Sequence, residues 1–557
     1  MTGYASSTAP RHPACRWTWS LALVFMLAEF LLFDAMTSRH HASLYPRWSD
    51  QIQYLTEAYT AHEHAREHGL LSGLAFTLKK NAPQGTLHDV AALFAFKVAG
   101  SASRSAALSL NLLVFLAWQA ALLFTLPRLT GSRALGWVAF GLLLCVAWPW
   151  SAEAGSAVDF RLDHAAMCLL GLASCCALLT DGFRRAGWSL AFGAAVGVTL
   201  LERFLTGAYF APVFVALAVW LAAGEARWPR LRNLGLAGLA AAALAGPAFW
   251  LNRTAIHTYY WVGHVAGTES TVRDRGFDAW HSLKFVFGHL GGMHLGAWFG
   301  WTALGLTAVA MAAFALVPRR PAAGWNRDWL FTALAFLLLP AVVLVLHRQK
   351  SEFVLGVLVP GALLLLLWAW SQLWQRLDFT TGPSWHRLPP VALALAALGS
   401  GGVFFAQKQL TSPHSPEFHA SARQVNEIAD RIFAASRELG LTNPYIGVDQ
   451  VVDFVDAPIL KVMSYERKKV WVPFVIQLPD SIMADEEAKI LYRLRLCDFV
   501  LLTDAMPGDG YWPYDKQMRR LYPLVKAWCE SNLRHVDSFR LFGRQMSLYQ
   551  RRDIPRD

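Results

Sequence analysis

The stretch "WTWSLALVFMLAEFLLFDAMTSRHHASLYPRWSDQIQYLTEAY" decides the fold and runs from Trp17 to Tyr59. Its first part, 17–36, is predominantly apolar. Because roughly 20 apolar residues cross a bilayer as a helix, this part is predicted to span a membrane. The second part reads as an amphipathic helix that opens with Asp50. A carboxylate at the mouth of a span either caps that helix or does chemistry at the membrane surface.

The composition of the whole chain is that of a multi-pass membrane protein. Of its 557 residues, 55% are hydrophobic and 16% are charged. Soluble proteins average about 25% charged residues. Eleven apolar runs are predicted as spans, at 17–36, 106–127, 134–150, 164–180, 187–201, 205–223, 234–251, 294–317, 329–346, 353–370 and 389–406. The fold class is therefore a polytopic α-helical membrane protein.

The distribution of basic residues predicts the orientation. With the N-terminus in the cytoplasm, the inner loops carry fourteen arginines, and the short outer loops carry four basic residues: Arg161, Arg203, Arg348 and Lys350. Cytoplasmic loops are enriched in Lys and Arg, so we expect Asp50 and the C-terminal part on the periplasmic side of a bacterial-type inner membrane. Residues 407–557 contain 21 basic and 20 acidic residues, so almost all of the +11 net charge lies in 1–406. Membrane loops account for that excess, and we expect no nucleic-acid partner.

Two domains are predicted. Residues 1–406 form the transmembrane domain, with long outer loops at 37–105 and 252–293. The segment "QLTSPHSPEF" reads as a linker, and 407–557 reads as a soluble periplasmic α/β domain. In that domain "NPYIGVDQVVDF" and "CDFVLLTD" predict strands, and "FRLFGRQMSLYQR" predicts a final hairpin with Gly543 in the turn. Cys497 and Cys529 lie in this domain, and an oxidising compartment would permit them to pair.

Charged residues gather at the outer ends of the spans, and each has a structural alternative. Asp50 with Gln53 resembles a capping box, and Asp163 is suited to cap the span beginning at His164. Arg161, Arg203 and Arg348 are placed to extend toward lipid headgroups. Glu29 lies inside the first span, where structural pairing and function are equally open. His64 and His68 are spaced to share a metal with Glu67, but a solvated helix face explains them better.

The order of several weak motifs resembles a known enzyme family. After "SDQIQYLTEAY" come "KNAPQGTLHDVAALFAFKVAG", "VDFRLDHAAMCLLGLA", "GWSLAFGAAVGVTLLERFLTGAYF" and "HRQKSEFVLGVLVPGALLLL". Their order and topology over roughly 17–370 resemble the GT-C glycosyltransferases that use polyprenyl-phosphate donors, of the protein mannosyltransferase and aminoarabinose transferase group. The resemblance implies a polyprenyl-phosphate-linked sugar as donor. It implies a cell-envelope glycan, lipid or protein as acceptor, with membrane lipids as surroundings.

The resemblance also implies roles for individual residues. Asp50 matches the usual catalytic base, and Asp163 matches a second acid before the fourth span. The matching phosphate-binding residues are basic: Lys79, Lys80, Arg161, Arg203, Arg348 and Lys350. We expect Tyr54, Glu57 and His164 to line the pocket for the acceptor and sugar. A single displacement would invert the anomeric centre.

Departures from the family pattern concern the acceptor and the metal. The family often has Asp-Glu where this chain has Asp50-Gln51, and its proline pair is reduced to "AP" at 82–83. Some members hold a divalent metal between acids, but no third acid stands at a convincing position here. We therefore expect metal-independent chemistry and no cofactor. Two other functions remain open: a transporter or flippase of lipid-linked sugars, and a sensor or assembly subunit acting through 407–557. A transporter is expected to show two related halves with broken spans, and the sequence contains no such repeat.

Overall fold

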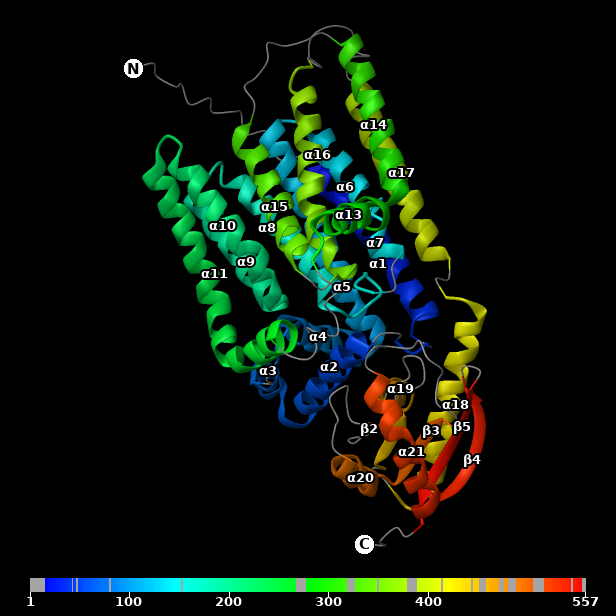
Figure 1. Cartoon of the computed structure of the whole chain (residues 1–557). Coiled ribbons are helices and arrows are strands. Elements are labelled where there is room, and N and C mark those ends of the chain that lie inside the picture. The colour runs from blue at the N-terminus through cyan, green and yellow to red at the C-terminus, as the bar shows by residue number, and fades with distance from the viewer. Residues whose placement is uncertain are drawn as a thin grey trace.

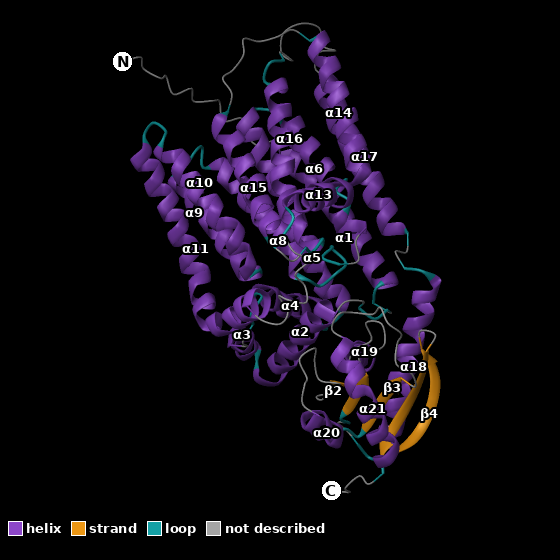
Figure 2. Ribbon diagram, in the orientation of Figure 1, coloured by secondary structure: helices purple, strands orange, loops and turns teal. Residues whose placement is uncertain are grey.

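The computed structural model describes most of the chain. The described residues are 16–42, 44–46, 49–79, 82–151, 154–266, 277–317, 326–347, 350–377, 388–411, 414–441, 444–449, 457–469, 475–478, 487–503, 515–541 and 544–552. Figure 1 shows a bundle of long helices at one end of the molecule and a small sheet domain at the other. Figure 2 shows that all of the described strands belong to that sheet domain.

The bundle contains the predicted spans. Ten described stretches are helical, long and apolar enough to cross a membrane, and α9 adds a 17-residue apolar helix at the position of the predicted 187–201 span. The prediction of a polytopic helical fold is therefore confirmed. The helices of the bundle are α1 (Arg16–His40), α5 (Arg104–Thr130), α6 (Arg133–Leu144), α7 (Trp148–Ser151), α8 (Leu162–Leu179), α9 (Ala186–Glu202), α10 (Gly207–Ala222), α11 (Arg227–Ile256), α14 (Gly296–Leu316), α15 (Arg327–Leu346), α16 (Val359–Trp374) and α17 (Leu388–Leu410).

Shorter helices connect the spans. Helices α2, α3 and α4 lie across one end of the bundle, between it and the sheet domain (Figure 1). The connecting elements are α2 (Ser49–His68), α3 (Leu70–Lys79), α4 (Leu87–Ala99), η1 (Phe204–Thr206), η2 (His257–Ala266), α13 (Ala279–His289), η3 (Leu290–Leu295) and η4 (Phe353–Leu358). The first outer loop of the sequence is thus mostly helical.

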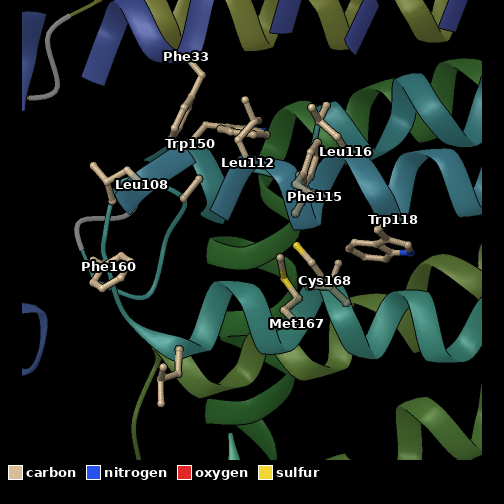
Figure 3. Close-up of a cluster of buried hydrophobic side chains, with 14 of the residues drawn as sticks. Phe33, Leu108, Leu112, Phe115, Leu116, Trp118, Trp150, Phe160, Met167 and Cys168 are labelled. Atoms are coloured by element: carbon tan, nitrogen blue, oxygen red, sulfur yellow. The ribbon is translucent and has the colours of Figure 1, made fainter. Parts of the chain in front are cut away.

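Large aromatic side chains fill the bundle core. Figure 3 shows Phe33 of α1 and Phe115 of α5 close to Trp150 of α7. The Trp150 ring centroid lies 6.5 Å from that of Phe33 and 4.9 Å from that of Phe115. Apolar side chains such as Leu27 and Leu31 of α1 are more than half exposed, as expected of a surface solvated by lipid.

Small residues let two spans approach closely. A Cβ placed on Gly401 of α17 would lie 2.1 Å from the carbonyl oxygen of Gly141 on α6. Only glycine leaves room for backbones this close, which is the usual device at helix crossings in membranes. Helices α6 and α17 are far apart in the sequence, and this contact joins the middle of the transmembrane domain to its last span.

The C-terminal domain is a five-stranded mixed sheet with helices. The strand order is β2-β1-β3-β5-β4, with β1 parallel to β2 and β3, and β5 antiparallel to β3 and β4. Its elements are α18 (Pro416–Glu438), β1 (Ile446–Asp449), α19 (Ala457–Lys468), β2 (Val475–Leu478), α20 (Glu487–Leu496), β3 (Phe499–Thr503), α21 (Asp515–Asn532), β4 (Leu533–Leu541) and β5 (Arg544–Arg551). The two predicted strands and the final hairpin are present, and Gly543 lies outside the described residues.

Two details of this domain were not settled by the sequence. Strand β2 was not predicted. The pairing of Cys497 and Cys529 was left open, and both residues are buried in the domain core without a disulfide between them. Burial raises the pKa of Cys497 to about 12, which keeps that thiol protonated and unreactive.

Candidate active site

Asp50 lies at the start of α2, where it remains reachable from solvent. Helix α2 begins at Ser49, so Asp50 is inside the first turn. A carboxylate there interacts favourably with the helix dipole. The Gln53 amide donates to Glu57 Oε1 at 3.0 Å, one turn further along the same helix. Position and contacts therefore do not support the capping-box interpretation, and the Asp50 side chain stays 48% exposed.

Arg161 connects Asp50 to a second carboxylate. Its Nη2 atom lies 3.5 Å from Asp50 Oδ2, and its Nε atom lies 3.2 Å from Asp159 Oδ2. The guanidinium carbon stands 4.9 Å from the centre of the Phe353 ring, at the start of η4. The Arg161 side chain is only 4% exposed. It is therefore held inside the protein and does not extend to lipid headgroups.

Asp159 is completely buried and is held by several donors. It accepts hydrogen bonds from Gln51 Nε2 at 2.6 Å and from the Gly155 amide at 2.5 Å. Burial raises the pKa of Asp159 to about 6, and Arg161 and the two hydrogen bonds limit the rise. Asn111 of α5 donates to the carbonyls of Ala157 and Asp159, at 3.1 and 2.8 Å. The loop that carries Arg161 is thus fixed to α5 and to α2.

A second ion pair stands beside the first. Asp163, in the first turn of α8, pairs with Arg203, the residue that ends α9. Both side chains are largely buried, so neither residue acts as a simple solvent-facing cap or headgroup contact. Because α8 starts at Leu162, Asp163 is inside the helix and not before it. Asp163 lies in α8 and Arg203 directly follows α9, so their pairing joins the start of α8 to the end of α9.

The segment between α3 and α4 packs against the end of α9. The Thr86 amide donates to the Leu201 carbonyl at 2.9 Å, and the Phe204 amide donates to the Gln84 carbonyl at 2.8 Å. His88 Nδ1 lies 2.7 Å from Glu202 Oε1, and both side chains are buried. A Cβ on Gly85 would lie 2.0 Å from the Glu202 carbonyl oxygen, so this close approach requires glycine. Glu202 and His88 thereby support the backbone next to Arg203.

Tyr54 lies one turn after Asp50 on α2 and joins the same group. It is buried, and its environment includes Asp50, Arg203, Tyr259 and Tyr260. Burial, followed by the Asp50 charge, raises the pKa of Tyr54 well above its ordinary value, which keeps the hydroxyl protonated as a donor. The structure thus brings together five predicted site residues, which we call the acid–arginine cluster: Asp50, Tyr54, Arg161, Asp163 and Arg203.

Two other predicted residues, His164 and Lys350, are placed elsewhere, and Glu57 makes a hydrogen bond within α2. His164 points into the bundle core, where Nε2 lies 3.2 Å from the Asn111 carbonyl oxygen and 3.6 Å from Cys168 Sγ. Lys350 Nζ donates to the carbonyls of Leu344, Val345 and His347 at 2.5–3.0 Å, so it caps the C-terminal end of α15. Glu57 bonds Gln53 within α2. His164 is therefore a packing residue, because α8 turns it away from Asp163.

The remaining predicted cations are not described. Lys79 is the last residue of α3, and its side chain lies outside the described residues, as do Lys80 and Arg348. Within the described parts of the chain, no three His, Cys, Asp or Glu side chains are grouped to hold a metal. The His64 and His68 rings stack with centroids 4.5 Å apart, and His64 Nε2 lies 3.1 Å from Ser72 Oγ. Glu29 is buried, with Gln119 Nε2 3.4 Å away.

Several residues of the site were not assigned from the sequence. Asp159 and Glu202 each lie close in sequence to an arginine of the cluster, and neither was assigned a role from the sequence. Gln51 and His88 showed no partner, because their contacts are to residues of distant spans. The spacing Asp159-x-Arg161 was the available signal, since alternate residues in an extended segment share one side.

Chemically, the acid–arginine cluster combines a reachable carboxylate with two held guanidinium groups. A carboxylate can accept a proton from a nucleophile, and fixed cations can stabilise an anionic leaving group. Three carboxylates, those of Asp50, Asp159 and Asp163, face the guanidinium groups of Arg161 and Arg203. The carboxylates therefore balance and position the two cations.

Comparisons with known proteins identify the fold. No protein-family model matches the chain, and no curated protein matches it by sequence. The crystal structure of ArnT from Cupriavidus metallidurans in the apo state matches with a TM-score of 0.57 at 15% identity, covering 96% of this chain and 98% of ArnT. ArnT bound to undecaprenyl phosphate matches with a TM-score of 0.56 at 14% identity and the same coverage.

A second solved structure is more distant. The archaeal oligosaccharyltransferase AglB from Archaeoglobus fulgidus, in complex with an inhibitory peptide and a dolichol-phosphate, has a TM-score of 0.45 at 11% identity. That match covers 98% of this chain and 76% of AglB. The ArnT matches cover nearly the whole of both chains, including the sheet domain. This chain therefore shares the fold of the ArnT structures over nearly its whole length, and the helical membrane fold with a C-terminal domain that the sequence predicted is confirmed.

Proposed function

We propose that this protein is an integral membrane glycosyltransferase that transfers a sugar from a polyprenyl-phosphate donor to a cell-envelope glycan, lipid or protein. The fold supports the proposal, because the matching ArnT structure binds undecaprenyl phosphate. The positive-inside distribution supports a bacterial-type inner membrane, a cytoplasmic N-terminus and a periplasmic site. The C-terminal domain then lies on the same side as the site.

The observation that carries the proposal is the contact between Asp50 and Arg161. Of the three aspartates around Arg161 and Arg203, Asp159 is fully buried and Asp163 is 6% exposed, whereas Asp50 is 48% exposed. Only Asp50 is thus open enough to meet an acceptor. Its buried arginine neighbour is in place to face a phosphate while Asp50 faces the nucleophile.

The proposed reaction is a single displacement. Asp50 accepts the proton of an acceptor hydroxyl or amine, and that oxygen or nitrogen forms a bond to the anomeric carbon. The bond between the anomeric carbon and the phosphate oxygen breaks, and polyprenyl phosphate leaves with the bonding electrons. Arg161 and Arg203 stabilise the charge that develops on that phosphate. Attack opposite to the leaving group inverts the anomeric centre.

The charges of the acid–arginine cluster indicate that the donor phosphate needs further cations to bind. Together with Asp159, the cluster sets three aspartates against two arginines, and this excess of negative charge disfavours a phosphate. We therefore expect the other predicted cations, Lys79, Lys80 and Arg348, to contribute to phosphate binding. No metal-dependent step is proposed, because the described acids are already engaged with arginine or accept backbone and side-chain hydrogen bonds.

The test uses the full chain in lipid nanodiscs and a panel of undecaprenyl-phosphate sugars with cell-envelope extract as acceptor. Wild-type protein is expected to release undecaprenyl phosphate from one member of the panel. Asp50→Asn is expected to reduce the rate by about 10²–10⁴-fold, the usual contribution of a general base. Gln53→Ala is the matched control. Gln53 lies on α2, as Asp50 does, and its side-chain amide donates to Glu57 of that helix.

Two outcomes would contradict the proposal. One is an Asp50→Asn variant that inserts normally and transfers sugar at the wild-type rate. The other is transport of intact donor across a liposome bilayer without cleavage of the sugar–phosphate bond, which would identify a flippase.

A further inference from the structure

The C-terminal domain contacts α2 through a reciprocal pair of tyrosine–glutamate hydrogen bonds. Tyr59 of α2 donates to Glu466 Oε1 of α19 at 2.7 Å. Tyr465 of α19 donates to Glu63 Oε1 of α2 at 2.5 Å. The two tyrosine ring centroids are 4.8 Å apart. Each helix therefore supplies one donor and one acceptor to the other, which fixes their relative position along both axes.

Glu466 also reaches the first residue of a membrane span. Arg104 begins α5, and its Nε and Nη2 atoms donate to Glu466 Oε1 and Oε2 at 3.1 and 2.5 Å. The Arg104 side chain is 4% exposed and that of Glu466 is 7% exposed. Arg104 Nη1 also donates to the His41 carbonyl at 3.0 Å. One buried carboxylate of the C-terminal domain thus accepts hydrogen bonds from both α2 and α5.

These two helices are the ones that build the cluster. Helix α2 carries Asp50 and Tyr54, and α5 carries Asn111, which holds the loop of Asp159 and Arg161. About two and a half helical turns separate Asp50 from Tyr59, so they project from opposite sides of α2. Asp50 therefore projects from the side of α2 opposite to Tyr59, and α19 packs against α2, next to which it lies in Figure 1.

The protonation of the tyrosines suits this role. Burial and the neighbouring Glu466 carboxylate raise the pKa of Tyr59 well above its ordinary value. Burial and the Glu63 carboxylate likewise raise the pKa of Tyr465. Both hydroxyls therefore stay protonated and donate throughout the physiological pH range.

We propose that α19 of the C-terminal domain holds α2 and α5 in the positions that set Asp50 against Arg161, with Glu466 as the positioning residue. This inference rests on the proposed glycosyltransferase function. It assigns the C-terminal domain a role in the rate of transfer. Donor binding is expected to be independent of the C-terminal domain, because Glu466 contacts α2 on the side opposite to Asp50.

The experiment compares Glu466→Gln and Tyr465→Phe with a matched control on the same helix. Lys468→Ala removes an ion pair between Lys468 Nζ and Asp430 Oδ1, which lies within the C-terminal domain and does not involve α2. Tyr465→Phe removes a single hydroxyl and keeps the ring contact with Tyr59. It serves as the second variant, because Glu466→Gln leaves Arg104 buried without a counter-charge and endangers folding.

Three quantities are measured on full-length protein in nanodiscs. The first is amide hydrogen exchange of α2, which reports local opening independently of activity. The second is binding of undecaprenyl phosphate, which gives the fraction of intact sites. The third is the rate of transfer per intact site. A residue needed only for folding would lower the number of sites but not the rate at each one.

For Glu466→Gln we expect exchange in α2 to be at least about tenfold faster, and transfer per site to fall about 10- to 100-fold. Undecaprenyl phosphate binding should change less than about threefold, and Tyr465→Phe should show smaller changes in the same direction. Lys468→Ala should match wild type. Unchanged amide exchange of α2 in both Glu466→Gln and Tyr465→Phe would overturn the inference. Faster exchange with an undiminished rate of transfer per site would also overturn it. Absence of transfer by the wild type would instead refute the proposed function. The amide exchange of α2 would still report on the contact between α2 and α19.

Discussion

Asp50 Oδ2 and Arg161 Nη2 lie 3.5 Å apart. Asp50 lies at the start of the helix that follows the first span, whereas Arg161 is the last residue of the loop before the fourth span. The half-exposed Asp50 carboxylate lies next to Nη2 of the guanidinium group, and the buried Asp159 carboxylate lies next to Nε. Arg161 is thus the residue through which an accessible acid and a buried acid influence each other.

Removing Arg161 should destabilise the protein and not merely inactivate it. Arg161→Leu leaves Asp159 buried without its cation, and breaking one side of a buried ion pair typically costs about 3–5 kcal/mol. We expect a clearly lower apparent melting temperature in nanodiscs. The double variant Arg161→Leu/Asp159→Asn should recover much of the loss, since no unpaired charge remains. A single variant that melts like wild type would contradict the buried pair.

The pH dependence should carry the signature of Asp159. Burial raises the pKa of Asp159 to about 6 in the folded protein, from an ordinary value near 4. Between these values the folded state binds more protons than the unfolded state, so stability falls as pH rises from about 4 to about 6 and is level above that. Wild type should therefore lose stability relative to Asp159→Asn over this interval, measured as apparent melting temperature against pH.

The same titration should appear in the rate of transfer. Protonated Asp159 no longer balances the charge of Arg161, so Arg161 then pairs more strongly with Asp50 and weakens it as a base. We expect an acid limb near pH 6 in the wild-type rate profile and its loss in Asp159→Asn. An identical acid limb in both proteins would assign it to another group.

Arg203 should contribute to phosphate binding. Hydrogen bonds to charged groups contribute about 1.5–3 kcal/mol, so Arg203→Gln should weaken undecaprenyl phosphate binding about tenfold or more. Native mass spectrometry in nanodiscs measures the affinity. The control is Arg128→Gln. Arg128 lies near the C-terminal end of α5 and donates to the Phe124 carbonyl of the same helix. Equal weakening in both variants would indicate a general effect on the bundle.

Gly155 should tolerate no side chain. Its φ is +66°, and an added Cβ would lie 2.7 Å from the Cβ of Phe353. A left-handed conformation costs other residues about 1–2 kcal/mol, and the clash must move the loop that holds Asp159. Gly155→Ala should therefore lower both stability and transfer. Gly187→Ala is the control, since nothing lies within 4 Å of its added Cβ. A Gly155→Ala variant equal to this control would show that the loop geometry does not matter.

The membrane fold followed from the sequence because lipid imposes a simple rule. Each span must be an apolar helix of limited length, so the eleven runs could be located without knowledge of their neighbours. The strands at 446–449 and 499–503 were found for a similar reason, since their buried positions form short apolar runs.

The members of the site were only partly predictable. Asp50, Asp163, Arg161 and Arg203 were chosen because charges at span ends are costly and few. His164 and Lys350 met the same criterion, yet one packs in the core and the other caps α15. The difference lies in which way a helix turns each side chain and which carbonyls lie nearby, and neither can be read from a span boundary.

By itself, the sequence determined that the chain has many apolar membrane-spanning helices, which acids and cations are available near their ends, and that an α/β domain follows the last span. Only the tertiary structure decided that Arg161 stands between Asp50 and Asp159, that Asp163 pairs with Arg203, and that Glu466 connects α2 to α5. The physical reason is the distance along the chain over which each property is set. Hydropathy acts residue by residue along the chain, whereas an ion pair requires two side chains from distant segments to meet within a few ångströms, and only the packing of the helices sets that distance.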